Sequence, residues 1–297
     1  MSLLRDAEGR VRAPYVVGVF TLVAVVTEGV STFLLGVLGF LGFGNLDSPR
    51  VIFSTAPTLA AGVAATLVAW LIFREPTGLA EPQFLRRLGQ GFAVGAVALT
   101  VACVVPALAG ATSLTLTSRS AGAVAGIGVL QLITLAPAAI GEELLIRGLG
   151  FQALRRGMGD AAAVVFSGLV FGGLHLFNPG ATWLASLEVA LVGFWFGALT
   201  VRTGSVWLAM GLHSAWNFFE GFVFGQPVSG TAPGTSIFVG HAPAEPGFWS
   251  GGAFGPEAAG WTAVVLVAGL AVTLLWPRSP PAGRSLDAAR DERPPLT

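Results

Sequence analysis

Eight apolar stretches dominate this sequence, and each is long enough to cross a lipid bilayer. A membrane-spanning helix needs about 20 mostly apolar residues. Charged residues make up 11% of the 297 residues, whereas soluble domains contain about 25%. We therefore predict an all-α, polytopic membrane protein with about eight transmembrane helices, over residues 14–43, 51–73, 90–111, 122–148, 160–178, 182–201, 204–225 and 257–276.

The arginine distribution predicts the orientation of these helices. The sixteen basic residues are all arginines, and thirteen of them lie before the first stretch, after the last one or in every second connection. The connections on the opposite side contribute Arg50 and Arg119. Because arginine-rich loops stay in the cytoplasm, we predict that both termini are cytoplasmic. The excess of Ala, Gly and Val and the lack of Lys are typical of a GC-rich bacterial coding sequence, so we expect a multi-pass protein of the bacterial cell membrane.

The chain shows no repeat and no change in composition that would divide its apolar part. We predict a single transmembrane helical domain over residues 1–278, with a catalytic core at 122–225 and a disordered cytoplasmic tail at 279–297. Residues 226–256 are rich in Gly and Pro, which predicts an outer loop that could cover the helices. The glycine pairs Gly91/Gly95 and Gly193/Gly197 predict close helix packing.

Three apolar stretches carry polar interruptions. The first is Glu142, Glu143 and Arg147 in the stretch 122–148. Residues four apart share one face of a helix, whereas adjacent residues are separated by about 100°. Glu143 and Arg147 are therefore expected to form an ion pair, which leaves Glu142 free to face a cavity. An ionisable residue inside a membrane predicts a functional site, because its burial in hydrocarbon is costly.

The other two interruptions carry the histidines. His175 lies in the fifth stretch, and His213 and Asn217 lie one helical turn apart in the seventh. At about 1.5 Å of rise per residue, counted from the cytoplasmic ends, these side chains and Glu142 fall in one layer of the bilayer. We predict that they converge. The alternative is a buried polar network that ties the helices together, although hydrogen bonds within membranes contribute only about 0.6 kcal/mol on average.

The chemistry that suits this set is the activation of water. A carboxylate shielded from bulk water can act as a general base near neutral pH, and a nearby His can share the water. A His–Asn pair on the opposite wall can donate hydrogen bonds to an oxyanion. Neither Cys103, the single cysteine, nor any serine lies in a nucleophile motif. The residues therefore favour hydrolysis of a peptide bond without a covalent intermediate.

The three motifs, in this order, resemble those of the CPBP family. These are the CAAX-processing and bacteriocin-processing intramembrane endopeptidases, which include the Ras-converting CAAX endopeptidase. The resemblance rests on Glu-Glu-x-x-x-Arg at 142–147, Phe-x-x-x-His at 171–175 and His-x-x-x-Asn at 213–217. It implies an all-helical fold with a conical cavity open to the cytoplasm. It implies that Glu142 and His175 activate water, that His213 and Asn217 stabilise the oxyanion, and that Glu143 and Arg147 support the site.

The resemblance leaves the cofactor and the substrate open. The family has been called metalloproteases, but Asn is a poor Zn²⁺ ligand and the sequence lacks His-Glu-x-x-His, so we expect no cofactor, with Zn²⁺ as the alternative. The expected partners are the lipid bilayer and a peptide or protein substrate that enters a membrane cavity, and no nucleic acid. Two other functions remain possible from the sequence: a catalytically silent peptide-binding scaffold or immunity protein, and a proton-coupled transporter.

Overall fold

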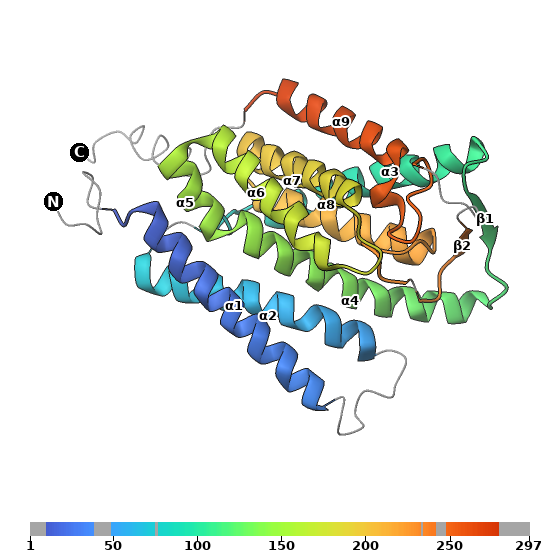
Figure 1. Cartoon of the computed structure of the whole chain (residues 1–297), viewed down its shortest axis with the longest axis horizontal. Helices are drawn as coiled ribbons and strands as arrows, with labels where there is room; N and C mark the ends of the chain where they lie inside the picture. Colours follow the sequence, from blue (N-terminus) through green and yellow to red (C-terminus); the bar gives the residue numbers. More distant parts are fainter. Residues whose placement is uncertain (1–9, 39–48, 75–76, 233, 242–247, 279–297) are drawn as a thin grey trace, which may run out of the picture.

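The computed structural model describes residues 10–38, 49–74, 77–232, 234–241 and 248–278 (Figure 1). Long helices dominate the described residues, as predicted. They are α1 (Ala13–Leu38), α2 (Pro49–Phe73), α3 (Phe84–Leu108), α4 (Ala121–Arg147), α5 (Leu149–Met158), α6 (Asp160–Leu174), α7 (Trp183–Thr203), α8 (Val206–Phe218) and α9 (Gly260–Leu275). Short helical turns follow α6 and α8 and precede α9: η2 (His175–Phe177), the π-helical turn η3 (Phe219–Val223) and η4 (Pro256–Ala258).

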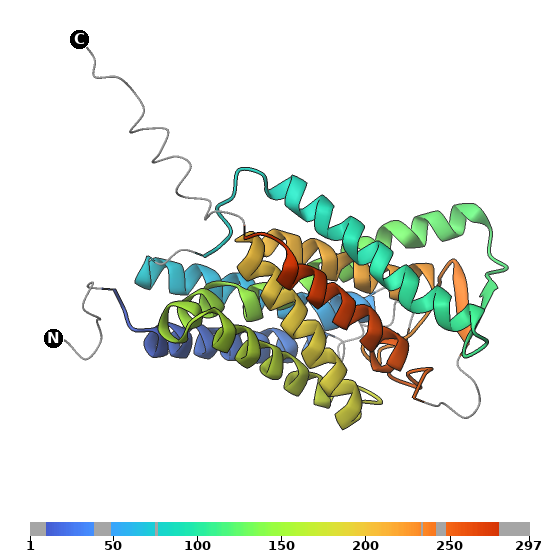
Figure 2. The same cartoon turned by 90° about the horizontal axis from the view of Figure 1, so that it is seen from above.

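The helices form one bundle whose two ends differ. The described parts of both terminal regions lie at one end, and the strands β1 (Ser113–Leu116) and β2 (Phe238–His241) lie at the other (Figure 1). In the view from above, α3 lies on the opposite side of the bundle from α1 and α6 (Figure 2). Six helical segments of the described chain are long and apolar enough to cross a membrane, whereas α9 is shorter. The polytopic all-α prediction is therefore confirmed; the number eight and the cytoplasmic termini stay predictions, and residues 279–297 lie outside the described part.

The outer surface of the bundle is apolar, as lipid contact requires. Large hydrophobic side chains such as Leu22, Phe33, Val97, Ile133 and Leu275 are all more than half exposed. The interior combines aromatic and aliphatic side chains with a few polar groups. Its main cluster includes Phe171, Trp195, Phe196, Leu212 and Trp216. The Trp195 indole donates a hydrogen bond to Thr273 Oγ1 at 3.0 Å, which satisfies a buried donor and ties α7 to α9.

Helices α3 and α8 pack closely because glycines leave room for the opposite backbone. A Cβ atom at Gly91 would lie 2.0 Å from the Leu208 carbonyl oxygen, and one at Gly95 would lie 2.3 Å from that of Leu212. A Cβ atom at Gly193 would lie 2.7 Å from Gly168 Cα in α6. The predicted close packing is thus confirmed at these three glycines. At Gly197 the nearest atoms would be in ordinary contact at 3.4 Å.

The fourth predicted stretch, residues 122–148, corresponds to helix α4, which a sharp turn separates from α5. Helix α4 runs through Pro137 without a break and stops at Arg147, and α5 starts in a new direction at Leu149. The break falls at Gly148, where a Cβ atom would lie 2.2 Å from the Leu144 carbonyl oxygen. A residue with a side chain does not fit there, so the glycine sets the turn. Helix α5 then packs through Leu149 and Ala153 into a second core cluster with α1 and α2.

The short β-sheet was not predicted from the sequence. Strands β1 and β2 pair antiparallel, with Ser113 opposite His241 and Leu116 opposite Phe238. The paired residues at the two ends of the sheet are 128 and 122 positions apart in sequence. Each strand is only four residues long, so neither has a recognisable alternating pattern. His241 Nε2 lies 3.2 Å from Thr115 Oγ1 in this exposed pair. The sheet fixes the segment that follows α8 at the end of the bundle away from the termini.

Substitution of Gly95 by alanine tests the packing of α3 against α8. The added methyl group would meet the α8 backbone, so we expect the Gly95→Ala variant to lose about 1–3 kcal/mol of stability. Gly89→Ala, in the same helix, is the matched control because a Cβ atom there has nothing within 4 Å. Melting temperatures of the detergent-purified variants should fall for Gly95→Ala alone. An equal effect of both substitutions would contradict the close approach.

Candidate active site

A cavity of about 1090 Å³ lies among α2, α4, η2, α8 and the segment Gly225–Gly240, which we call the outer segment. Four of the predicted site residues line it: Glu142, His175, His213 and Asn217. They come from three elements that are far apart in the sequence. The structure therefore brings these four side chains to one cavity. Glu143 and Arg147 do not line it.

The adjacent carboxylates Glu142 and Glu143 have different surroundings. The Glu142 side chain is 30% exposed and faces the cavity, whereas the Glu143 side chain is fully buried behind the wall. This difference follows from the angle of about 100° between successive residues of a helix. One carboxylate is thus available to a substrate and to water, and the other is available to protein groups.

Arg147 balances the charge of Glu143 in the interior. Its Nη1 donates a hydrogen bond to Glu143 Oε1 at 3.0 Å, which confirms the expected ion pair one helical turn apart. Its Nη2 donates to the Gly193 carbonyl oxygen of α7, also at 3.0 Å. The guanidinium carbon lies 4.6 Å from the Phe171 ring centroid and 5.6 Å from that of Phe196. Arg147 therefore joins α4, α6 and α7 around a desolvated charge, a setting in which cation–π contacts gain strength.

The His213 imidazole lies between the two carboxylates. Its Nδ1 lies 3.0 Å from Glu143 Oε1, and its Nε2 lies 3.8 Å from Glu142 Oε2. A carboxylate accepts a hydrogen bond, so Nδ1 carries the proton and Nε2 is the nitrogen on the side of Glu142. The ring also contacts Phe171 edge-on at 6.0 Å and Phe196 at 5.4 Å between centroids. Glu143 thus sets both the tautomer and the orientation of His213.

His175 is oriented by Phe171, the residue one helical turn before it in the Phe-x-x-x-His motif. The His175 Nδ1 atom lies 2.8 Å from the Phe171 carbonyl oxygen, and the two rings are 4.6 Å apart between centroids. A carbonyl oxygen only accepts, so Nδ1 is the donor and Nε2 is the nitrogen left for other partners. Helix α6 ends at Leu174, and His175 begins the tighter turn η2. Nε2 can therefore form a hydrogen bond with a molecule such as water.

Asn217 lies one turn beyond His213 on α8. It is 7% exposed, and its Oδ1 has no hydrogen-bond partner among the described residues. A buried amide without a full set of partners is costly in an apolar interior. Together with its position on the cavity wall, this leaves the Asn217 amide free to interact with a molecule in the cavity.

The remaining acidic residues of the spans lie off the cavity. Glu220 continues the His213–Asn217 face by sequence, but it is fully buried and does not line the cavity. Glu188 is 5% exposed within α7, and Glu28 accepts a hydrogen bond from Thr58 at 3.4 Å. Neither lines the cavity, and no arginine pair with either is present in the described part of the chain.

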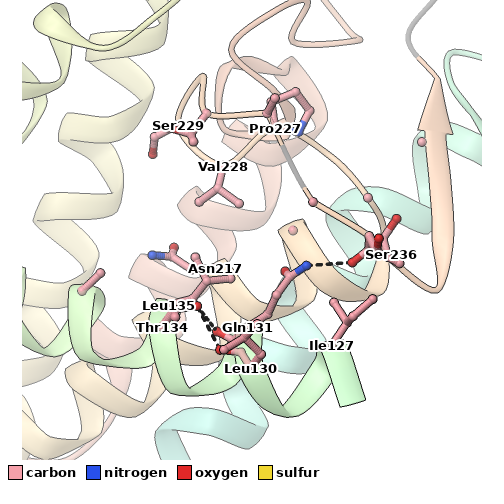
Figure 3. A pocket seen from close by; sticks show the side chains of 18 of the residues that line it. Ile127, Leu130, Gln131, Thr134, Leu135, Asn217, Pro227, Val228, Ser229 and Ser236 are labelled. Carbon is pink, nitrogen blue, oxygen red and sulfur yellow. Dashed lines mark hydrogen bonds between the residues drawn. The ribbon is translucent and has the colours of Figure 1, made fainter. Parts of the chain in front are cut away.

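Several uncharged polar residues of the cavity were not predicted from the sequence. Gln131 and Thr134 lie on the same stripe of α4 as Glu142, and Gln131 Nε2 donates to the Thr235 carbonyl oxygen at 2.7 Å (Figure 3). Asn178 Nδ2 donates to the Ser229 carbonyl oxygen at 3.1 Å. The spacing 131, 134, 138, 142 in an otherwise apolar helix was a usable signal for the first two. The partners in the outer segment had no such signal, because that segment has no periodicity.

The donor set does not fit a metal ion. Across the described residues, no three His, Cys, Asp or Glu side chains converge closely enough to hold one. The fourth group on the cavity wall is an amide, which is a poor Zn²⁺ ligand. Independence from a cofactor stays a prediction that solution experiments must test.

Comparisons with known proteins connect this geometry to a family. Residues 124–219 match the family model described as type II CAAX prenyl endopeptidase Rce1-like. The matched range runs from the first turn of α4 into η3 and contains all six predicted site residues. The resemblance to the CPBP family is confirmed. The Rce1-like proteins are a family of proteases, so the match supports a multi-pass membrane protease in general.

One curated relative is similar to this chain over a short segment. The uncharacterized protein YyaK of Bacillus subtilis (strain 168) is 37% identical over 83 residues, which is 26% of this chain. The alignment spans 27% of the relative's own length. The similarity thus concerns about a quarter of each chain.

Two of the sequence expectations are incompatible with each other. The lining residues with exposed side chains or backbone are Arg119, Thr231, Ala232, Gly234 and Val239, and these lie at the end of the bundle that carries β1 and β2. The terminal regions lie at the other end (Figure 1). A cytoplasmic position of both termini and a cavity open to the cytoplasm therefore cannot both be correct.

Removal of the Arg147 charge tests the buried ion pair. Arg147→Met leaves the Glu143 carboxylate buried and uncompensated, which costs about 3–5 kcal/mol in comparable sites. We expect a strongly lowered melting temperature of the detergent-purified protein. The double variant Glu143→Leu/Arg147→Met should recover much of that loss, because neither charge of the pair then remains buried. A single variant as stable as the wild type would show that the pair is not desolvated.

Proposed function

We propose that this protein is an intramembrane endopeptidase that hydrolyses a peptide bond with water activated by Glu142 and His175. The observation that carries the proposal is the contrast between the two adjacent carboxylates. Glu142 lines the cavity together with both histidines and Asn217, whereas Glu143 is sealed behind it by Arg147 and His213. A purely structural polar network would not need one partly exposed carboxylate on a cavity wall.

The proposed reaction starts with a water molecule between Glu142 and His175. Glu142 removes one proton from this water. The other O–H group of the water donates a hydrogen bond to His175 Nε2. The hydroxide attacks the carbonyl carbon of the peptide, and the carbonyl oxygen becomes an oxyanion. The proton held by Glu142 then passes to the leaving amine as the carbon–nitrogen bond breaks. The products are a carboxylic acid and an amine, which exchange a proton to give a carboxylate and an ammonium ion, and no covalent enzyme intermediate forms.

His213 and Asn217 are proposed to stabilise the oxyanion. Both line the cavity one turn apart on α8, so they can donate to one oxygen atom. Donation by His213 requires a proton on Nε2 in addition to the one on Nδ1. The Glu142 and Glu143 carboxylates on either side of the ring balance that charge. Glu143 and Arg147 act as positioning residues, since they touch His213 and one another rather than the cavity.

Kinetic measurements on site variants test this assignment. The detergent-purified full chain should cleave members of a fluorogenic peptide library. Glu142→Ala and His175→Ala should lower kcat by about 10²–10⁴-fold, the usual contribution of acid–base groups. Asn217→Ala should lower it by about 10²–10³-fold, as expected for one oxyanion donor.

The matched control for these variants is Glu188→Gln. This residue is a buried acidic side chain of α7 away from the cavity, so its substitution should leave kcat unchanged. Folding of each variant is checked by its melting temperature. If Glu142→Ala and His175→Ala cut as fast as the wild type while folded, the set is not a hydrolytic site. Binding of peptide without cleavage by the wild type would favour a silent peptide-binding scaffold.

Treatment with a chelator tests the proposed independence from metal ions. The described residues offer no cluster of three metal-ligating side chains at the site. We therefore expect peptide cleavage at an unchanged rate after incubation with EDTA and removal of the chelate. A loss of activity that added Zn²⁺ restores would contradict the proposal and would assign the cavity histidines and Glu142 as ligands.

A further inference from the structure

The sidedness of the cavity follows from where the arginines lie in the fold. Helix ends that carry arginine gather at the end of the bundle where the terminal regions lie (Figure 1). In the described chain these are Arg10, Arg12, Arg74, Arg86, Arg87, Arg155, Arg156, Arg202 and Arg278. The end with β1 and β2 has Arg50 in the first turn of α2 and Arg119 just before α4. By the positive-inside rule, the arginine-rich end faces the cytoplasm.

The exposed rim of the cavity lies at the arginine-poor end. It is formed by Arg119 and by exposed residues of the outer segment and β2, including Thr231, Ala232 and Gly234. We propose that the cavity takes extended peptide segments from the extracytoplasmic side of the membrane. The side of the membrane to which the cavity opens is inferred from the arginines and the rim alone. That the cavity binds a peptide rests on the proposed function.

The depth of the cavity sets the length of such a segment. On α4 the lining runs from Ile127 near the rim to Glu142. These residues are 15 positions apart, which corresponds to about 22 Å along the helix. An extended chain advances at most about 3.3–3.6 Å per residue, so about six or seven residues connect the rim to Glu142. The substrate must therefore offer a free end or a long flexible loop outside the membrane.

The wall between the rim and Glu142 has the chemistry that an extended backbone needs. Each residue of a peptide brings one N–H and one C=O group, and each unpaired group costs several kcal/mol in an apolar setting. The charged side chains of the lining are Arg119 at the rim and Glu142 at the base, with His213 Nε2 3.8 Å from Glu142. The rest of the wall supplies amides and hydroxyls from Thr117, Gln131, Asn178, Asn217, Thr231 and Ser236. Figure 3 shows several of them around the space below Pro227 and Val228.

Cysteine labelling tests the sidedness without requiring activity. The background is Cys103→Ser, because Cys103 is the single cysteine of the chain and is only 4% exposed. Three variants of the full-length protein follow: Ala232→Cys at the rim, Thr134→Cys inside the cavity and Met158→Cys at the end of α5. Met158 is 50% exposed at the arginine-rich end and serves as the matched control. The probe is a charged, membrane-impermeant maleimide, added to spheroplasts of a bacterial host and to inverted vesicles.

We expect Ala232→Cys and Thr134→Cys to react at least tenfold faster in spheroplasts than in inverted vesicles, and Met158→Cys to show the reverse. Labelling of Ala232→Cys from the inverted side would overturn the orientation. Labelling of Thr134→Cys from the side opposite to Ala232→Cys, or from neither side, would overturn the access route. Melting temperatures equal to that of the background confirm that each variant is folded.

Protection from labelling separates this inference from the proposed function. An unprenylated decapeptide library added to spheroplasts should slow the reaction of Thr134→Cys and leave Met158→Cys unchanged. If the labelling shows the expected sidedness and the library protects Thr134→Cys, peptide entry from the extracytoplasmic side is supported. If no peptide is cut in that case, only the hydrolytic mechanism is wrong. If the library does not protect Thr134→Cys, the peptide occupant is wrong although the orientation stands.

Discussion

The buried ion pair between Glu143 and Arg147 is the interaction on which the candidate site depends. It places two opposite charges in a fully desolvated position, where either one alone would be strongly unfavourable. Arg147 also binds the Gly193 carbonyl oxygen of α7, and Glu143 binds His213 of α8. The pair therefore links three helices at one point and fixes the ring that faces Glu142. A small residue at position 193 is needed, because a Cβ atom there would lie 3.3 Å from Arg147 Nη2 and 2.7 Å from Gly168.

This arrangement divides the work between two adjacent acidic residues. The charge of Glu143 is balanced by Arg147, and Glu143 positions His213 by accepting a hydrogen bond from its ring. Glu142, rotated by about 100° around the same helix, faces the cavity and has no arginine partner in the described residues. Phe171 also belongs to the site. Its ring contacts Arg147 and both histidines, and its carbonyl oxygen orients His175. The motif spacing thus encodes contacts that run between helices as well as within them.

The sequence predicted the parts of the site that follow from geometry within one helix. The Glu143–Arg147 pair, the outward turn of Glu142 and the shared face of His213 and Asn217 all come from the helical repeat. Contacts between helices, such as that of Arg147 with Gly193, depend on tertiary packing that a spacing does not specify. The predicted end of the fourth stretch at residue 148 agrees with the break at Gly148, but the close approach to the Leu144 carbonyl oxygen that requires glycine there could not be predicted from the sequence. Gln131 and Thr134 could have been found, since they share the stripe of Glu142.

The direction in which the cavity opens could not be predicted from residue spacing. The outer segment is irregular and rich in Gly and Pro, so its path over the cavity depends on contacts such as those of Gln131 with Thr235 and Asn178 with Ser229. The pairing of β1 with β2 brings together chain segments more than 100 residues apart. Only with these elements in place does the rim appear at the end opposite the terminal regions (Figures 1 and 3). If the terminal regions are cytoplasmic, as the arginines predict, this position changes the expected access route and leaves the proposed chemistry of the site unaltered.

The most direct test of the account compares Glu142→Gln with Glu143→Gln in one experiment. Both substitutions remove a single charge and keep the shape of the side chain. The rate of peptide cleavage and the melting temperature are measured for each purified variant. We expect Glu142→Gln to lower kcat at least about 100-fold, because it removes a general base, and to leave the melting temperature unchanged. We expect Glu143→Gln to lower the melting temperature, because Arg147 then remains buried without a counter-ion. An active Glu142→Gln variant, or an equal loss of stability in both, would contradict the division of roles.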